Sequence, residues 1–385
     1  MLPDFGSDQF LAQVEWFKRS ERLYQSYLLS ITALLQGMTV QFYRSQAEAG
    51  TNIKLFSATF DRSIFFSIES RHKTIFFFGS NSERDYWAVQ HLQDNKSILK
   101  ALLHKSNINT PFGGAVNAND KRVLTALRNA TVPLVTVKPI TGIHSKGVQL
   151  RQTLAQAEAT IASNPTSAFI VEQHINGTEF RVTASKTKVI AAQKVAPAYV
   201  VGDGVATLKQ LVEREGAARN RNPARRSRPA SLEVIARSAA AKGWDGNTVL
   251  PKGEVFYYAA DNITSTQFRI PVLDQLPQNV RNCAIATVRA TKAAFITMDI
   301  VVDYAGEPYV VDVDSSCAMS MECFPYPNGE WNLTVPEYIL KHHFPRHKRV
   351  DRVIKSYDYA ALNEELFREG RTSKGVNAAD FVEFG

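Results

Sequence analysis

The stretch 295–321, FITMDIVVDYAGEPYVVDVDSSCAMSM, constrains the fold more than any other part of this 385-residue chain. Two apolar, β-branched runs flank a tight turn at Gly306, which is the pattern of a β-hairpin. Because side chains alternate between the two faces of a strand, Asp312 and Asp314 share one face, and Asp299 on the first strand meets them there. Three converging carboxylates are suitable ligands for a hard cation such as Mg2+.

These aspartates have a plainer alternative explanation, which is that acidic residues simply end strands. Asp303 beside the turn fits that explanation. The second strand contains Val310, Val311 and Val313, which indicates a buried strand in which unpaired carboxylates would be costly. Mg2+ usually takes one or two carboxylates together with substrate phosphates, so the hairpin favours nucleotide chemistry over a structural ion.

A second candidate site lies in residues 132–149, VPLVTVKPITGIHSKGVQ. A β-branched strand ends at Lys138, a loop with Gly142, Lys146 and Gly147 follows, and the chain then returns to a strand. Glycines let backbone N–H groups approach phosphate oxygens, and the lysines supply positive charge. The segment therefore predicts a phosphate-binding loop, with an ordinary hairpin as the alternative.

A third candidate site is residues 169–181, FIVEQHINGTEFR, which predict a strand, a short linker, a turn at Gly177 and a second strand. Nucleotide sites often hold the adenine edge through main-chain groups of such a linker, and the ribose hydroxyls through a carboxylate that follows. Glu179 is in the position of that carboxylate and shares a strand face with Arg181. The alternative is the polar outer face of a hairpin.

Taken together, these segments resemble the ATP-grasp superfamily of carboxylate-amine ligases. The order is Lys-Pro, a glycine-rich loop, Val-Glu-x-x-Ile-x-Gly-x-Glu, and finally Asp-x-Val with a later acidic pair. The similarity is to the ATP-grasp modules of cyanophycin synthetase and of bifunctional glutathione synthetase, and it spans about residues 75 to 325. Further matching motifs occupy residues 94–100, 142–148, 200–212 and 262–266.

The resemblance implies an α+β ATP-grasp fold, in which two subdomains grip ATP between them behind an N-terminal, substrate-side domain. The implied nucleotide contacts are Lys100, Lys138, Lys146, Gly142 and Gly147 at the phosphates, Glu172, Gln173 and Ile175 at the adenine, and Glu179 at the ribose. The implied catalytic residues are Arg181, Arg269 and His144, which would steady the acyl phosphate or the substrate carboxylate, or close over the γ-phosphate. The implied ligands of two Mg2+ ions are Asp299, Asp312 and Asp314.

The activity that the resemblance implies is ATP-dependent amide-bond formation. A carboxylate attacks the γ-phosphate of ATP to give an acyl phosphate, and an amine then displaces the phosphate. Neutralising the transferring phosphoryl group is the main catalytic need, which metal ions and basic side chains meet. The implied substrates are amino acids or short peptides, in small-peptide or natural-product biosynthesis, and a homo-oligomer (dimer or tetramer) is typical of the superfamily.

Three short segments depart from the family's pattern. Residues 312–314 read Asp-Val-Asp where the family usually has Glu-x-Asn, residues 317–318 replace a Pro-Gly, and residues 266–268 replace a Thr-Gly-Gly. These changes fall at the expected metal and substrate positions. A catalytically impaired pseudoenzyme, or a protein that binds and senses the nucleotide, therefore stays open as the alternative function.

The net charge of +8 raises a different alternative, a nucleic-acid binder. Basic residues crowd residues 219–228 and 346–355, but no recognised nucleic-acid motif accompanies them. We therefore predict no nucleic-acid partner and interpret the basic segments as solvated loops, or as a lid that attracts ATP and an anionic substrate.

Composition and cysteine usage indicate the class of protein. A chain of 385 residues with 44% apolar residues can fill more than one core. No apolar run is long enough to span a bilayer, and residues 1–10 lack the features of a secretory signal, so no membrane association is predicted. Cys283, Cys317 and Cys323 lack metal-binding spacing, which favours a cytoplasmic location and a buried structural role for Cys317.

Motif positions predict four parts of the chain. These are an N-terminal, substrate-side domain (1–90), a small nucleotide subdomain (91–185), a large subdomain with the metal site (186–344) and a C-terminal tail (345–385). Helices are predicted over 96–105, 154–163 and 279–295.

Overall fold

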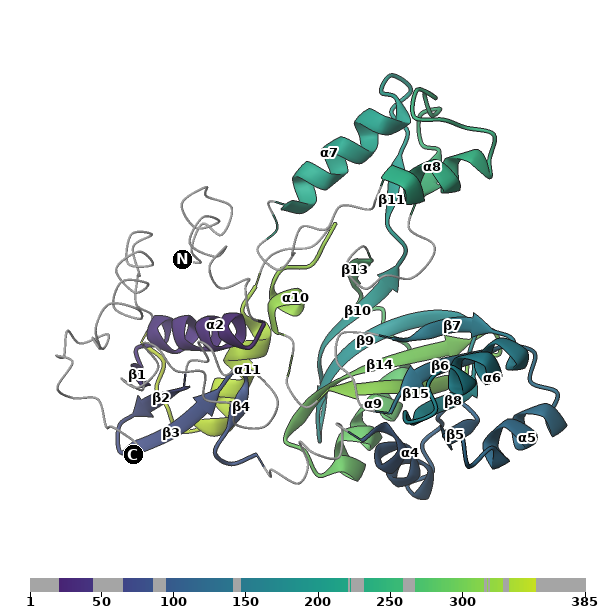
Figure 1. Cartoon of the computed structure of the whole chain (residues 1–385). Helices are drawn as coiled ribbons and strands as arrows, with labels where there is room; N and C mark the ends of the chain where they lie inside the picture. Colours follow the sequence, from purple (N-terminus) through teal and green to yellow (C-terminus); the bar gives the residue numbers. More distant parts are fainter. Residues whose placement is uncertain are drawn as a thin grey trace, which may run out of the picture.

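The computed structural model describes residues 21–43, 65–85, 95–140, 147–220, 222, 232–258, 267–314, 317, 319–327 and 332–350. Within these residues the chain forms mixed helices and antiparallel sheets in three lobes (Figure 1). An N-terminal lobe lies at one side, two sheets with their helices form the body at the other, and an arm projects from the body.

The N-terminal lobe is an antiparallel sheet of order β1-β2-β3-β4, covered by helix α2. Its elements are α2 (Glu21–Leu35), β1 (Thr39–Tyr43), β2 (Phe65–Ser70), β3 (Lys73–Phe78) and β4 (Asn81–Ser82). Helices α10 (Met319–Cys323) and α11 (Thr334–His343) share the hydrophobic core of this lobe, and Figure 1 shows them beside α2. The lobe is therefore built from segments about 300 residues apart in the sequence.

The smaller sheet of the body has the order β5-β8-β6-β7. Its strands are β5 (Gly113–Val116), β6 (Val135–Pro139), β7 (Gln149–Gln152) and β8 (Phe169–Gln173), and its helices are α5 (Arg122–Asn129) and α6 (Leu154–Ala162). Helix α6 starts with a capping box, in which Thr153 and Gln156 satisfy each other's backbone N–H groups. The two helices pack on the sheet through a core that includes Leu124, Val137 and Ile161.

The larger sheet of the body has the order β13-β10-β9-β14-β15. Its strands are β9 (Gly177–Ser185), β10 (Val189–Ala196), β13 (Phe268–Pro271), β14 (Phe295–Asp303) and β15 (Pro308–Asp314). The predicted hairpin is confirmed, because β14 and β15 pair antiparallel with Asp299 opposite Asp312. One sheet face, with Val182, Met298 and Val310, packs on helices α4 (Lys96–Lys105) and α9 (Gln278–Thr291).

This packing decides where the polar residues of the larger sheet lie. Alternation along each strand turns one set of side chains toward α4 and α9, so the other set must occupy the opposite face. Gly177 lets β9 pair closely with β14, because a Cβ there would lie 1.9 Å from the carbonyl oxygen of Val302. The regular pairing of β9 with β14 continues from Gly177 to Arg181, which lies opposite Asp299.

The arm consists of β11 (Tyr199–Val201), α7 (Leu208–Asn220), α8 (Leu232–Ala240) and β12 (Val255–Tyr257). It is held to the body by Arg219, whose guanidinium lies over the rings of Phe268 at 5.1 Å and Tyr326 at 5.7 Å. Arg219 also pairs with Glu215 at 2.7 Å. The first arginine of the basic run 219–228 is therefore a buried anchor, and the other arginines of that run lie outside the described residues.

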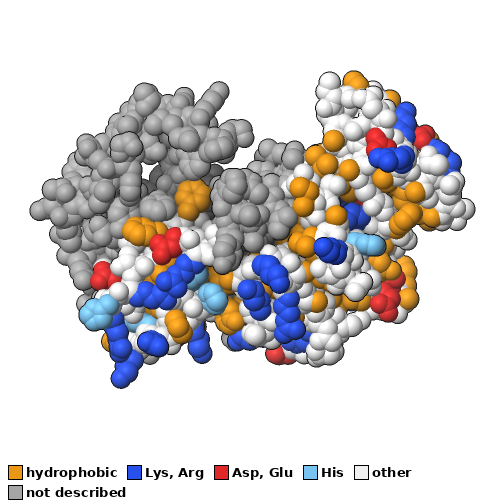
Figure 2. All heavy atoms as spheres, turned by 90° about the horizontal axis from the view of Figure 1, so that it is seen from below, with side chains coloured by type: hydrophobic (Ala, Val, Ile, Leu, Met, Phe, Trp, Pro, Cys, Tyr) orange, Lys and Arg blue, Asp and Glu red, His pale blue; other side chains and the backbone are white. Residues whose placement is uncertain are grey.

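Figure 2 shows lysine and arginine side chains spread over the face of the molecule seen from below. This distribution is consistent with the net charge of +8. Within the described part of the chain, no helix has the length and apolar character needed to cross a membrane. The tail from 351 onward is outside the described residues.

Candidate active site

The face of the larger sheet that is turned away from α9 carries a row of charged residues. Arg181 of β9 pairs in register with Asp299 of β14, and Asp299 pairs with Asp312 of β15. Thr183 and Thr297 form the next pair along the same face, and their hydroxyl oxygens are 2.8 Å apart. Strand register therefore brings together residues that are more than a hundred positions apart in sequence.

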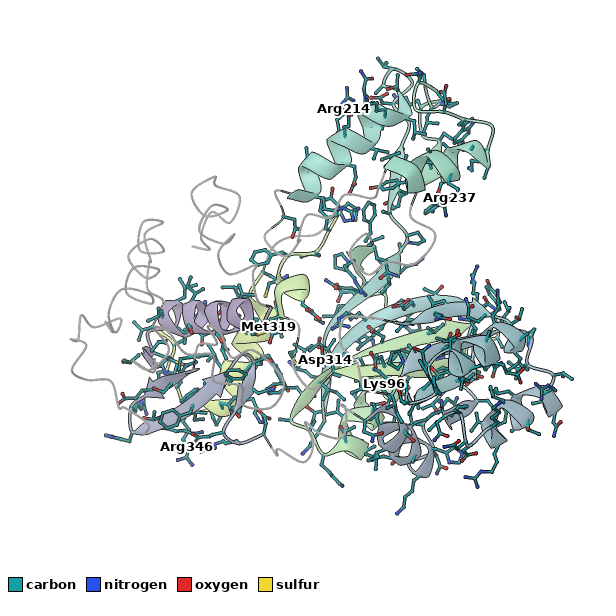
Figure 3. The ribbon with its side chains drawn as sticks, viewed as in Figure 1. Lys96, Arg214, Arg237, Asp314, Met319 and Arg346 are labelled. Carbon is teal, nitrogen blue, oxygen red and sulfur yellow. The ribbon has the colours of Figure 1, made fainter. Side chains whose placement is uncertain are left out.

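Each of the three side-chain nitrogens of Arg181 lies within 4.0 Å of a carboxylate oxygen. Its Nη1 lies 3.1 Å from Asp299 Oδ1, its Nη2 lies 3.7 Å from Asp314 Oδ2, and its Nε lies 4.0 Å from Glu322 Oε1. In Figure 3, Asp314 lies in the middle of the molecule, between Lys96 and Met319 of α10. The guanidinium thus lies beside two of the three carboxylates that were predicted to bind metal.

The three predicted metal ligands lie on neighbouring strands, but each is paired with a cation. Asp299 and Asp314 contact Arg181, and Asp312 accepts a 2.5 Å hydrogen bond from Lys96. Among the described residues, no group of three or more His, Cys, Asp or Glu residues is arranged to hold a metal ion. Mg2+ needs only one or two carboxylates when substrate phosphates supply the rest, so the donors fit an ion that arrives with a nucleotide.

Two predicted phosphate-binding lysines converge on one buried carboxylate. Glu172 lies 2.6 Å from Lys138 Nζ and 2.8 Å from Lys100 Nζ. Lys138 also donates a 2.9 Å hydrogen bond to the carbonyl oxygen of Val311, which connects the smaller sheet to β15 of the larger one. A pocket between α4, β6, β8 and β15 is lined by Lys96, Lys100, Lys138, Glu172 and Asp312.

The charges of this pocket stabilise one another. Burial by itself would raise the pKa of Glu172, but Lys138 and Lys100 outweigh it and lower that pKa. Burial would lower the pKa of Lys138, but Glu172, Asp312 and Asp299 outweigh it and raise that pKa. Burial lowers the pKa of Lys100. The two lysines and Glu172 thus leave one surplus positive charge, which favours an anionic ligand.

The linker predicted to hold adenine follows β8 directly. The amide of Gln173 donates to the carbonyl of Phe112 at 2.7 Å, and the amide of His174 donates to that of Leu134 at 2.8 Å. The side chain of Glu172, predicted at the adenine, instead lies between the two lysines. Ile175, the last residue of this linker, is half-buried. The roles of Glu172, Gln173 and Ile175 toward adenine stay predictions.

The glycine-rich loop is described only at its C-terminal end. Gly147 has a φ of 75°, and a Cβ there would lie 2.9 Å from Pro139 Cγ, so both the conformation and the space favour glycine. Gly142, His144 and Lys146 lie outside the described residues. Their roles at the phosphates therefore stay predictions.

Glu179 and Arg269 complete the polar face. Burial and the neighbouring Asp299 raise the pKa of Glu179 to about 7, against the influence of Arg269 and Arg181. Arg269 is only 4% exposed, and its backbone pairs with that of Tyr326. Burial, and next the charge of Arg181, lower the pKa of Arg269. Two guanidinium groups close enough to repel each other favour an anion near them.

Two charged residues of the site had no role in the sequence-based predictions: Lys96, which lies in the matching motif 94–100, and Glu322, which lies in none. Lys96 is four positions before Lys100 on α4, a spacing that places both on one helix face and was a usable signal. Glu322 on α10 accepts a 3.1 Å hydrogen bond from the Thr183 hydroxyl. Its only sequence signal is that it is a single carboxylate inside an apolar run. Burial raises the pKa of Glu322 to about 7.

The cysteines near the site agree with a structural role. Cys317 and Cys323 are buried, and burial raises the pKa of each thiol. Because the thiolate is the reactive form, a raised pKa disfavours nucleophilic chemistry.

Comparison with known proteins gives the following relatives. The glutathione biosynthesis bifunctional protein of Listeria innocua is 27% identical over 263 residues, covering 64% of this chain and 34% of that protein. Cyanophycin synthetase of Synechocystis sp. is 25% identical over 200 residues, covering 48% of this chain and 22% of that protein. The crystal structure of a bifunctional glutathione synthetase from Pasteurella multocida superposes with a TM-score of 0.56 and 20% identity, over 76% of this chain and 41% of that one. No protein-family model matches the chain.

These are the two kinds of protein whose motifs the sequence resembles, so the predicted resemblance is confirmed. The chain spans about a third of the length of the glutathione biosynthesis proteins that it matches.

Proposed function

We propose that this chain, which has the α+β ATP-grasp fold, is an ATP-dependent carboxylate-amine ligase that forms an amide bond through an acyl phosphate. The observation that carries this proposal is the pocket where Lys100 of α4 and Lys138 of the smaller sheet meet Asp312 of the larger sheet. Cationic and carboxylate groups that converge from two sheets suit a magnesium-bound triphosphate held between them.

The residues of the pocket have distinct roles in this proposal. Lys100 and Lys138 hold the phosphates, exchanging part of their contact with Glu172 for phosphate oxygens. Asp299 and Asp312 are the proposed ligands of Mg2+, with Asp314 beside them. Mg2+, when bound, neutralises charge on the phosphate oxygens. Glu179 faces the same side and is the proposed ribose contact.

Arg181 connects the nucleotide end of the site to the reacting end. It contacts Asp299 on one side and Glu322 on the other. If Asp299 served as a metal ligand, the guanidinium of Arg181 would be free to bind the acyl phosphate, whose oxygens carry the developing charge. Arg269 lies on the same face and supplies a second guanidinium. His144 and the glycine-rich loop would exclude water, which otherwise hydrolyses an acyl phosphate.

The proposed substrates are amino acids or short peptides. This proposal is supported by the similarity to a glutathione biosynthesis bifunctional protein and to a cyanophycin synthetase. The motifs favour an enzyme of small-peptide or natural-product biosynthesis. We propose that it is cytoplasmic and works as a homo-oligomer. The domain boundaries at about residues 90, 185 and 344 belong to the same proposal.

The decisive experiment incubates the chain with ATP, Mg2+ and amino acids, singly and in pairs, and measures phosphate release and product mass. We expect at least one pair to stimulate phosphate release and to give a product lighter by one water than the sum of the pair. Asp274→Asn, an exposed carboxylate outside the site, is the matched control and should behave as the parent protein.

A second candidate function is a protein that binds a nucleotide without turning it over. It is favoured by one observation: Arg181 and Lys96 already pair with all three predicted metal ligands. This candidate predicts ATP binding that no amino-acid pair converts into phosphate release. Calorimetric titration with ATP beside the turnover assay separates the two functions.

A further inference from the structure

The arm meets the body at Arg219, the first arginine of the basic run 219–228, and this residue has no role in the proposed function. Arg219 is 3% exposed. Its Nε and Nη2 donate to Glu215 Oε1 at 2.9 and 2.7 Å, and its Nη2 lies 3.4 Å from the hydroxyl of Tyr258. Tyr258 donates its own hydroxyl hydrogen to Glu215. The guanidinium is therefore bound inside the protein, which leaves it unsuited to attracting a dissolved anion.

The same guanidinium connects helix α7 to two segments of the body. It lies over the ring of Phe268 on β13 at 5.1 Å and over that of Tyr326, in the segment after α10, at 5.7 Å. The two rings contact each other edge to face, with their centroids 5.5 Å apart. The hydroxyl of Tyr326 also donates to the backbone carbonyl of Glu215 at 3.2 Å. We call Glu215, Arg219, Tyr258, Phe268 and Tyr326 the clamp.

The clamp adjoins Arg269, one of the arginines proposed to bind the acyl phosphate. Arg269 follows Phe268 on β13, and alternation along the strand turns Phe268 into the core of the arm and Arg269 toward the polar face. The backbones of Arg269 and Tyr326 exchange two hydrogen bonds, of 2.8 and 3.3 Å. The clamp thus holds Arg269 through the side chain of its neighbour and through its own N–H and C=O groups.

The side chain of Arg269 has few bonds of its own that could fix its direction. Its Nη2 lies 3.5 Å from Gln267 Oε1, which is long for a hydrogen bond. Its Nε and Nη1 have no hydrogen-bond partner among the described residues. The guanidinium therefore takes its position mainly from the backbone that the clamp holds. Position matters for a reacting group, since a misplacement of about 1 Å can lower a rate by about 100-fold.

We propose that Arg219 is a positioning residue, which through the clamp holds Arg269 where it can bind the acyl phosphate. This inference rests on the proposed ligase function and gives a role in it to a residue of the arm. The phosphate-side pocket lies against β15, whereas Arg219 contacts β13, at the opposite edge of the larger sheet. Loss of Arg219 should therefore slow the reaction without weakening ATP binding.

The test is a double-mutant cycle on the full chain, with ATP, Mg2+ and the amino-acid pair that gives the fastest phosphate release. Its variants are Arg219→Met, Arg269→Gln and the combination of the two. We expect Arg219→Met alone to lower kcat by about 30-fold to 100-fold and to leave KM for ATP within about twofold of the parent value. In the Arg269→Gln background, the same substitution should change kcat by less than about threefold, because no guanidinium remains to be positioned.

Two further variants separate positioning from a general loss of stability. Arg219→Lys keeps a cation beside Glu215 and over the two rings, so kcat should stay within about fivefold of the parent value. Arg214→Met is the matched control on α7, because Arg214 is exposed and pairs with Asp203 at 3.1 Å on the arm (Figure 3). Its kcat should equal that of the parent protein.

Tyr326→Phe keeps the test decisive if Arg219→Met does not fold. It removes only the hydroxyl group that donates to Glu215 and keeps the ring beneath the Arg219 guanidinium. We expect kcat to fall by about threefold to tenfold, and this fall should vanish in the Arg269→Gln background. Circular dichroism and urea denaturation establish that each variant is folded before its kinetics are measured.

The outcomes are distinguishable. The positioning role is overturned by a kcat of Arg219→Met equal to the parent value, by an equal factor lost in both backgrounds, or by a rise in KM for ATP that exceeds the fall in kcat. Equal losses in both backgrounds would mean that Arg219 only stabilises the fold. Absence of phosphate release from the parent protein with every pair overturns the ligase function itself, and the catalytic role of Arg219 with it, before any variant is measured.

Discussion

The two ends of the polar face differ in how their charges are satisfied. At the β15 edge, Lys100, Lys138 and Glu172 form a closed set of ion pairs, and Asp312 is held by Lys96. Toward the β13 edge, Arg269 and Glu322 are buried with polar atoms left without partners among the described residues. At one end each charged group has a counter-ion, and at the other end buried polar atoms of the described residues lack hydrogen-bond partners.

From this difference we predict two modes of ligand binding, one at each edge of the larger sheet. At the β15 edge, a nucleotide must exchange internal counter-ions for its own phosphates, so the folded state does not depend on it. Toward the β13 edge, a ligand adds hydrogen bonds that the protein lacks, so its presence should stabilise the fold. The following substitutions test this difference between the two ends, in order of decreasing expected effect.

The largest effect is expected from Asp299→Asn. This carboxylate lies between the two ends, because it pairs with Asp312 across the strands and with Arg181. We expect phosphate release to fall by about 1000-fold, since charge stabilisation of the transferring phosphoryl group is lost. Coupled ADP assays over a range of Mg2+ concentrations measure the effect, and turnover within tenfold of the parent protein would contradict the metal assignment.

The next effect is a difference in stability between two variants of the ion pairs that Glu172 forms with Lys100 and Lys138. Glu172→Gln leaves two buried ammonium groups beside each other, and we expect a loss of about 3–5 kcal/mol in the free energy of unfolding. Lys138→Met leaves the neutral pair of Lys100 and Glu172, so its cost should be clearly smaller. Urea denaturation of both variants tests the order, and an equal or larger loss for Lys138→Met would refute it.

A third effect concerns pH and the buried carboxyl of Glu322. Its pKa is raised from 4.5 to about 7 by burial. A folded-state pKa above the unfolded value means that this group's stabilisation is complete below pH 4.5 and is lost as pH rises through about 7. The size of this loss is on the order of 3 kcal/mol.

Glu322→Gln should abolish that contribution. We therefore expect the variant to be more stable than the parent protein at pH 8, and to lose less free energy of unfolding between pH 5 and pH 8. Denaturation curves at both pH values provide the measurement. A variant that is less stable than the parent at pH 8 would show that Arg181 compensates the Glu322 charge more fully than its 4.0 Å contact suggests.

The smallest effect is expected from Lys96→Met. The ion pair with Asp312 is partly exposed, and such pairs contribute about 0–1 kcal/mol to stability. Removing the lysine frees Asp312 for a metal ion, so half-maximal activity should require less Mg2+. Lys105→Met, at the exposed end of the same helix, is the control. An unchanged Mg2+ requirement would argue against Asp312 as a metal ligand.

Much of the local structure was predictable because short-range rules determine it. The helix predicted over 96–105 is α4, which begins where the Asn95 side chain caps the backbone N–H groups of Ser97 and Ile98. The hairpin followed from period-two alternation around Gly306, but a regular register would pair Asp299 with Val311. An irregularity between Asp299 and Ile300 shifts the register and brings Asp299 opposite Asp312. Helix α9 ends at Thr291, four residues before the predicted end, because Lys292 adopts a left-handed conformation.

The candidate site was predictable only in part. Lys100, Lys138 and Asp312 were chosen from their motifs, and they do line one pocket. The pairing of Glu172 with both lysines was not foreseen, because it depends on how α4, which packs on the larger sheet, approaches β8 of the smaller sheet. The sequence likewise did not predict that α10 and α11 would pack in the hydrophobic core of the N-terminal lobe. An apolar run indicates that a segment is buried, but not which core it belongs to.

The sequence by itself determined the strands, their polar and apolar faces, and the order of the motifs, because backbone periodicity and capping act over a few residues. Only the tertiary structure decided that α10 would bring Glu322 against Arg181, and that Arg269 on the opposite edge strand would be left without a complete set of partners. Those contacts join positions far apart in the chain, and burial and charge act through space rather than along the sequence.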